Sequence, residues 1–80
     1  MTIGEACKIK IQALCEERNI TVNKLAIISG ITQSTLNNIV SGRNNSLTLS
    51  TLKKICDGLE ISILEFFSDD IFVGLEQEIK

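Results

Sequence analysis

Residues 21–42, TVNKLAIISGITQSTLNNIVSG, constrain the fold of this chain more than any other stretch, because helix-start and helix-end signals alternate along them. Thr21 and Thr32 are good N-cap residues. Gly30 and Gly42 can take the left-handed backbone that ends a helix. The stretch therefore predicts two short helices, each of about eight to ten residues, joined by a tight turn.

Apolar residues follow a helical spacing before the turn. Leu25, Ala26 and Ile28 are expected to point inward, and Ile31 is expected to plug the turn. The small side chain of Ala26 lets a second helix cross closely, and Gly30, four residues later, fixes a sharp turn. These two residues argue against an ordinary antiparallel helix pair with a polar outside.

The second predicted helix combines an apolar stripe with an outer face of unusual composition. Leu36, Ile39 and Val40 recur at helical spacing and predict the buried side. A solvated helix face more often carries Lys and Glu, which form helices better than Asn or Ser. Uncharged amides and hydroxyls there indicate a surface that reads hydrogen-bond patterns. This outer face consists of Gln33, Ser34, Asn37, Asn38 and Ser41.

These residues resemble the helix-turn-helix of the Cro and phage-repressor family, also called the xenobiotic-response-element family. The family pattern is leucine-alanine, then glycine, then T-Q-x-[ST]-[LI], and it is matched by Leu25, Ala26, Gly30 and residues 32–36. The resemblance covers roughly residues 5–68. It implies an all-α fold, a compact five-helix lambda-repressor-like DNA-binding domain, with its helix-turn-helix motif at about residues 22–41.

The flanking helices are predicted by their own caps. Thr2 and Glu5 have the spacing of a capping box that opens a helix running to about Arg18, and Asn19 is a suitable left-handed stop. A further helix is expected at about residues 49–59. The buried stripe of the first helix is predicted as Cys7, Ile11, Leu14 and Cys15. That of the later helix is predicted as Leu49, Leu52, Ile55, Cys56 and Leu59, after the cap Thr48.

A closing helix is predicted by a second capping box, formed by Ser62 and Glu65. Phe66 and Phe67 are expected to seal the core. Where the resembled family usually has glycine before this helix, the chain has Glu60, so this junction is expected to be strained or differently shaped.

Two positions depart together from the resembled family. The family usually pairs an arginine at the end of its first helix with a glutamate near the end of the recognition helix, and this chain has Cys15 and Val40 there. Losing both charges avoids the buried unpaired charge that losing one would leave. We therefore expect Cys15 to contact Val40.

Residues 69–80 form a C-terminal tail beyond the resemblance. Its apolar residues are more than a solvated terminus needs, so the tail either covers an exposed core edge or meets a second subunit. The second alternative, a dimerisation element, is favoured.

The remaining composition bears on chemistry and location. The chain of 80 residues has no histidine, and Cys7, Cys15 and Cys56 lack the spacing of a metal site. The cysteines are interpreted as small buried hydrophobes, with redox sensing as the less favoured alternative. No metal, cofactor or enzymatic activity is expected. No apolar run is long enough to span a membrane, and a cytoplasmic location is expected.

Charge is distributed unevenly along the chain, whose formal net charge is -2. Residues 18–56 include five basic residues and no acidic residue, whereas residues 57–80 include seven acidic residues and one basic residue. Such segregation predicts a positive face around the helix pair, although an acidic protein is unusual for binding DNA.

The resemblance and the polar outer face together predict a sequence-specific double-stranded DNA-binding transcriptional regulator, a repressor that binds a two-fold symmetric operator as a homodimer. The alternative is a protein-interaction module that reuses the fold, such as an antitoxin-like partner or an adaptor. Base contacts are expected from Thr32, Gln33, Ser34, Asn37 and Asn38. Phosphate contacts are expected from Thr21, Asn23, Thr35, Ser41, Arg43 and Asn44.

Overall fold

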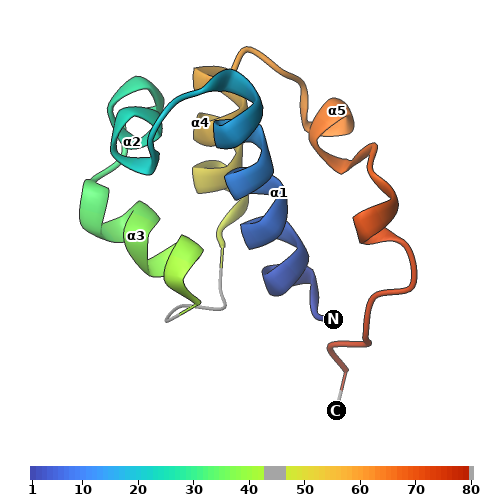
Figure 1. The fold of residues 1–80 in the computed structure, drawn as a ribbon. Coiled ribbons are helices and arrows are strands. Elements are labelled where there is room, and N and C mark those ends of the chain that lie inside the picture. Colours follow the sequence, from blue (N-terminus) through green and yellow to red (C-terminus); the bar gives the residue numbers. More distant parts are fainter. Residues whose placement is uncertain (43–46, 80) are drawn as a thin grey trace.

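Five α-helices and a short 3-10 helix make up the secondary structure of residues 1–42 and 47–79, which are the residues that the computed structural model of the chain describes (Figure 1). No strand occurs among these residues, so the predicted all-α class is confirmed. The elements in order are α1 (Ile3–Arg18), α2 (Val22–Ser29), α3 (Gln33–Ser41), α4 (Leu49–Gly58), α5 (Ile63–Phe67) and the 3-10 helix η1 (Asp70–Phe72).

All five α-helices begin at the residues that the sequence predicts as caps. In each case a hydroxyl oxygen accepts a hydrogen bond from the backbone N–H three residues later, which satisfies one of the free donors of the first turn. The caps of α1 and α5 are complete capping boxes, because a glutamate side chain also returns to the N-cap backbone. The caps are Thr2, Thr21, Thr32, Thr48 and Ser62.

Left-handed residues end the first three helices, as expected. Asn19 follows α1 with φ 56°, Gly30 follows α2 with φ 69°, and Gly42 follows α3 with φ 80°. These three stops give the chain the sharp turns that bring α2 and α3 back against α1.

The junction between α4 and α5 also contains a left-handed residue, but this residue is Glu60 and not a glycine. Glu60 has φ 58°, and its N–H donates to the Asp57 carbonyl at 3.1 Å. The next N–H, from Ile61, returns to the Cys56 carbonyl at 3.0 Å. A side chain in this conformation costs about 1 kcal/mol or more, because its Cβ crowds the neighbouring carbonyl. The predicted strain at Glu60 is therefore confirmed.

The core lies between the helices: α2 packs against α3 and α4, α1 packs against α3 and α2, and α5 packs against α4 (Figure 1). Leu25 and Ala26 of α2 are fully buried, as predicted. The predicted stripe of α3 is confirmed in Leu36 and Ile39, while Val40 is half-buried against the same cluster. The other fully buried large side chains are Ile11, Ile55, Cys56, Leu59 and Phe66.

Two predicted core residues are exposed instead. Ile28 of α2 is 41% exposed, and the residue after it, Ser29, is buried in its place. The reason is a close crossing of α2 and α4: a Cβ added to Gly58 would lie only 2.5 Å from Ser29 Oγ. Leu49 of α4 is 79% exposed, because the first turn of α4 stands at the open rim of an apolar groove.

The apolar replacement of the family ion pair is compatible with the packing of α1 against α3. Cys15 is buried, and Val40 packs against the core cluster that contains it. The Gln12 side chain, one turn before Cys15, donates a hydrogen bond to the Val40 carbonyl at 3.4 Å. The two helices thus meet at the expected positions, and a direct contact between Cys15 and Val40 stays a prediction.

The tail packs against its own chain through aromatic residues. The ring centroid of Phe72 lies 4.7 Å from that of Phe67 and 5.8 Å from that of Phe66. Such spacings are favourable for aromatic pairs. The first part of the tail therefore covers a core edge, which is the alternative that the sequence favours less.

Polar contacts join the rest of the tail to α1 and to Met1. Asp69 pairs with Lys10 at 3.0 Å, and the amino group of Met1 pairs with the Glu76 carboxylate at 3.2 Å. The Glu76 N–H also donates to the Met1 carbonyl at 3.1 Å. These contacts leave Val73 and Ile79 exposed, and dimerisation through the tail stays a prediction.

The three cysteines are free and buried, as expected for small hydrophobic residues. Burial raises the pKa of the Cys7, Cys15 and Cys56 thiols, which lowers the fraction of reactive thiolate. This environment favours an inert role over redox sensing. Within the described part of the chain, no helix has the length and apolar character needed to cross a membrane.

Candidate nucleic-acid interface

The turn between α2 and α3 is set by backbone geometry. The N–H of Gly30 points back to the last turn of α2, and the N–H of Ile31 donates to the Ala26 carbonyl at 3.1 Å. Among the described residues, apart from the chain neighbours of Gly30, no atom lies within 4 Å of the position that a Cβ on Gly30 would occupy, so the glycine is required by its φ of 69° and not by crowding. Thr32 then starts α3 directly, which fixes the angle between the two helices.

The first turn of α3 is held by two threonine hydroxyls. Thr32 Oγ1 accepts from the Thr35 N–H at 3.2 Å and donates its own proton to Thr35 Oγ1 at 2.7 Å. Because that proton is engaged, Thr32 can offer a base edge only an acceptor. Thr35 keeps its proton, so its hydroxyl can donate to a phosphate oxygen.

The outer face of α3 presents uncharged polar groups to solvent. Gln33, Ser34 and Asn37 are exposed, and Asn38 is half-buried. Each amide carries a donor and an acceptor in one plane, which matches the paired donor and acceptor of an adenine edge. Gln33 is the first residue of α3, the end of a recognition helix that reaches base edges in related docking geometries.

In the last turn of α3 the predicted phosphate donor, the Ser41 hydroxyl, is engaged within the helix. The Ser41 hydroxyl donates to the Asn38 carbonyl at 3.3 Å. Since a phosphate offers only acceptors, the predicted phosphate contact of Ser41 requires this hydroxyl to turn away from the helix.

The start of α2 offers donors to an anion. The Lys24 N–H donates to Thr21 Oγ1 at 3.0 Å, and the side chains of Asn23 and Lys24 are exposed. The N-terminal end of a helix favours negative charge, because several N–H groups there lack partners. Thr21 and Asn23, two of the predicted phosphate contacts, lie at this end of α2. Two further predicted phosphate contacts, Arg43 and Asn44, lie outside the described residues.

The structure revises the charge distribution inferred from the sequence. Lys53 pairs with Asp57 one turn later in α4, and Lys10 pairs with Asp69, so both ammonium groups have local counter-charges. Lys8 is a basic residue near α3 that the sequence does not predict as a site residue. Its Nζ lies 3.7 Å from the position that a Cβ on Gly42 would occupy, at the end of α3. The distribution of charge along the sequence does not reveal the place of Lys8, because α1 and the end of α3 are brought together only in the fold.

No acidic residue occurs in α2 or α3, and Lys24 is the one charged residue in these two helices. The Glu and Asp residues responsible for the net negative charge lie elsewhere in the sequence. The outer surface of α3 can therefore approach a polyanion without direct repulsion from its own side chains.

Comparison with known proteins agrees with this geometry. Residues 10–70 match the family model of the Cro/C1-type HTH DNA-binding domain, which spans more than half of the chain. The chain belongs to the Cro/C1-type helix-turn-helix family. This confirms the resemblance to Cro and phage repressors inferred from the residues around the turn.

Two relatives come from Bacillus subtilis (strain 168). The chain is 36% identical to the HTH-type transcriptional repressor RghR over 52 residues, which are 65% of this chain and 38% of RghR. It is 35% identical to the uncharacterized HTH-type transcriptional regulator YozG over 65 residues, which are 78% of this chain and 77% of YozG. The chain thus spans well under half of RghR and about three quarters of YozG. No solved structure matches it.

Proposed function

We propose that this Cro/C1-type protein is a sequence-specific transcriptional regulator that inserts α3 into the major groove of duplex DNA. The outer face of α3 carries this proposal, because exposed amides and hydroxyls stand there on a helix with a fixed start. The major groove is about 12 Å wide and admits one α-helix. Gln33, Ser34, Asn37 and Asn38 then face base edges, with the Thr32 oxygen available as an acceptor.

Phosphate contacts complete the docking. The N-terminal turn of α2, capped by Thr21, places free N–H groups and Asn23 beside one strand. The Thr35 hydroxyl and Lys8 supply further donors near α3. These groups position the protein, whereas the amides of α3 supply the discrimination between sequences. Because the chain has only eight lysine and arginine residues and a formal net charge of -2, its non-specific affinity for DNA is expected to be modest.

A repressor role and a two-fold operator are the finer part of the proposal. RghR is named a transcriptional repressor, and its similarity to this chain supports repression by occupancy of a promoter. Two copies on a two-fold operator would place their α3 helices about one helical turn of DNA apart, roughly 34 Å. Dimerisation doubles the number of base contacts, which compensates for the short recognition helix.

Selection of bound sequences from random duplex DNA at low salt tests the proposal. The expected result is enrichment of one motif whose two halves are related by two-fold symmetry. The chain must show a helical circular dichroism spectrum in the same buffer. A folded chain that enriches no sequence and retains no duplex would contradict the proposal and would favour the protein-interaction module.

A further inference from the structure

Three residues on one face of α1 lie along the last turn of α3. Lys8, Gln12 and Cys15 are spaced by four and then three positions, so their side chains point to the same side of the helix. Cys15 is buried in the core cluster against which Val40 packs. The Gln12 amide nitrogen lies 3.4 Å from the Val40 carbonyl oxygen, and the Lys8 ammonium lies beside Gly42. The end of α3 therefore meets α1 over about two turns of α1.

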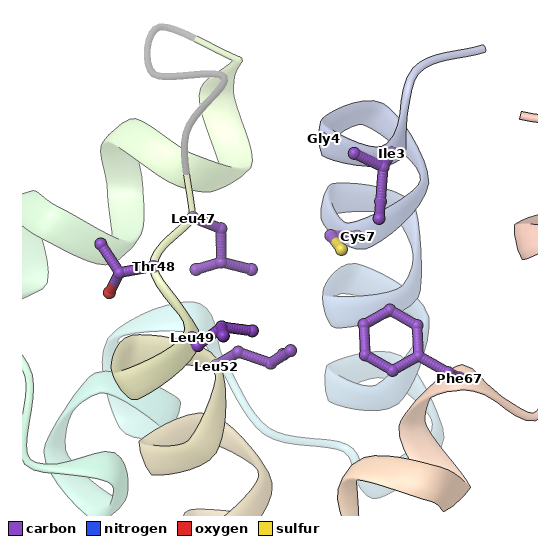
Figure 2. Close-up of a pocket in the computed structure, with 8 residues that line it drawn as sticks. All are labelled: Ile3, Gly4, Cys7, Leu47, Thr48, Leu49, Leu52 and Phe67. Atoms are coloured by element: carbon purple, nitrogen blue, oxygen red, sulfur yellow. The ribbon is translucent and has the colours of Figure 1, made fainter. Parts of the chain in front are cut away.

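The start of α1 faces an apolar groove with a volume of about 270 Å³. Figure 2 shows Leu47 and Leu52 on one wall of the groove and Cys7 on the opposite side. This open space separates the first turns of α1 from the segment that leads into α4. The contact of α1 with the end of α3 lies further along α1, at Lys8 and Gln12.

The hydrogen bond from Gln12 ties the end of α3 to another helix. The last carbonyls of a helix have no partner within that helix. The Ile39 carbonyl accepts from the Gly42 N–H at 3.3 Å, which is a bond inside the cap of α3. The Val40 carbonyl accepts from the Gln12 side chain of α1. Among the described residues, no other hydrogen bond joins α1 to α3.

An amide that donates to a carbonyl fixes direction as well as distance. The N–H must point at the oxygen, whereas the apolar contacts of Cys15 and Val40 with the core allow small rotations. In the resembled family an ion pair supplies this direction, and the chain has Cys15 and Val40 in its place. Gln12, almost one turn before Cys15, supplies a directional contact instead. Its distance of 3.4 Å is long for such a bond, so the bond orients α3 more than it stabilises the fold.

The length of α3 shows why its far end needs this contact. The helix has nine residues and is about 13 Å long. Thr32 and the turn at Gly30 fix its start. A rotation of about 5° around that start would move the other end by roughly 1 Å, which is comparable with the tolerance of a hydrogen bond to a base edge. Asn37 and Asn38 would move more than Gln33, because they lie further from the fixed start.

We propose that Gln12 is a positioning residue for base reading, which holds the end of α3 at the angle that Asn37 and Asn38 require. This inference rests on the proposed insertion of α3 into the major groove. It adds a residue of α1 that acts through the Val40 carbonyl and not by contact with a base. Loss of the Gln12 donor relaxes the choice of base at the positions that Asn37 and Asn38 read, and it preserves the choice at the position that Gln33 reads.

Gln12→Met tests the proposal, because methionine keeps the length and helix propensity of the side chain but has no N–H donor. Its affinity for the operator selected from random DNA should fall by about fivefold, with little change for a scrambled duplex. Gln12→Lys returns a donor of similar reach and should restore the ratio of the two affinities. Gln77→Met, the same exchange at an exposed glutamine of the tail, should change neither affinity. A role in folding alone would lower both affinities by the same factor.

Double variants locate the effect within α3. Asn37→Ala combined with Gln12→Met should weaken operator binding by less than the two changes add up to, because Asn37 no longer needs to be positioned. Gln33→Ala and Gln12→Met should be additive. An unchanged ratio of affinities in Gln12→Met, an equal fall on both duplexes, or simple addition with Asn37→Ala would overturn the proposal.

Amide hydrogen exchange of the free protein separates this proposal from the proposed function. In Gln12→Met the N–H groups in the last turn of α3 should exchange about fivefold faster than in the wild type, while those of α2 keep their rates. Equal rates in the two proteins would overturn the role of Gln12 even if the wild type binds an operator. A wild type that binds no duplex would overturn the proposed function and the link to base reading, whereas faster exchange in Gln12→Met would still show that Gln12 holds α3.

Discussion

Replacing Gly58 by alanine tests how closely α2 and α4 cross. Gly58 is the last residue of α4, and a Cβ at this position would meet α2 at three atoms. It would lie 2.5 Å from Ser29 Oγ, 3.1 Å from Ser29 Cα and 3.2 Å from the carbonyl carbon of Ile28. The hydroxyl can rotate away, but the two backbone atoms can move only if α2 shifts.

Two opposing effects set the size of the change. Alanine has a higher helix propensity than glycine by about 1 kcal/mol, which would stabilise α4. Overpacking against a neighbouring backbone typically costs about 1 to 3 kcal/mol. Since one contact is far below normal van der Waals distance and two are tight, we expect Gly58→Ala to lower the free energy of unfolding by about 1 kcal/mol net. In a domain of this size that corresponds to a fall in Tm of about 4 to 8 °C.

A second substitution separates the hydroxyl from the backbone contacts. Ser29 Oγ is buried and has no hydrogen-bond partner among the described residues. Ser29→Ala should therefore stabilise the fold by about 1 kcal/mol, because it removes an unsatisfied polar group. In the double variant Gly58→Ala should cost less than it does alone, yet the contacts with Ser29 Cα and the Ile28 carbonyl carbon would persist. Ser50→Ala, an exposed change in α4, is the matched control and should shift stability by less than about 0.5 kcal/mol.

Urea unfolding followed by circular dichroism measures the wild type and these variants in one buffer. The close crossing predicts that Gly58→Ala has a lower midpoint than the wild type and that the two substitutions are not additive. A higher midpoint for Gly58→Ala, near the full propensity gain, would show that α2 and α4 do not cross so closely.

Three further changes test local features of the fold and the site. Glu60→Gly should raise the free energy of unfolding by about 0.5 to 1 kcal/mol, because relief of left-handed strain exceeds the backbone entropy of glycine; an unchanged urea midpoint would contradict this. Thr21→Ala should lower the free energy of unfolding by about 1 kcal/mol and weaken DNA binding. Unchanged melting together with unchanged affinity would place the start of α2 elsewhere. The hydrogen bond from the Ser62 N–H lowers the pKa of Glu65 below its usual 4.5. The ionised Glu65 therefore stabilises the fold above that pH, and this stabilisation fades as the pH falls through the lowered pKa. Glu65→Gln should reduce the loss of stability on acidification, and a melting profile against pH identical to that of the wild type would refute this.

The helix starts could be predicted from the sequence because each depends on residues three positions apart. A capping hydroxyl and the N–H that it accepts are neighbours in the chain, as for Thr21 with Lys24. The left-handed stops at Asn19 and Gly30 follow from intrinsic backbone preferences in the same way. The helical spacing of Leu36 and Ile39 likewise predicted which face of α3 is buried.

Burial at the edges of helices could not be predicted, since it depends on where another helix crosses. Ile28 has the periodicity of a core residue, but the approach of Gly58 buries Ser29 instead. Leu49 extends the apolar stripe of α4 into its first turn, where the side chain is exposed. Ion pairs between distant parts of the chain could not be predicted for the same reason. Lys10 and Asp69, for example, are 59 positions apart.

Binding of the operator selected from random DNA, compared with a scrambled duplex, tests most directly whether α3 reads sequence. Gln33→Ala should weaken binding to the operator by about 1 to 3 kcal/mol and leave binding to the scrambled duplex nearly unchanged. Gln77→Ala, which removes an exposed glutamine from the tail, should change neither affinity. An equal loss of affinity for both duplexes in Gln33→Ala would show that Gln33 contacts the DNA backbone and would contradict its role in reading bases.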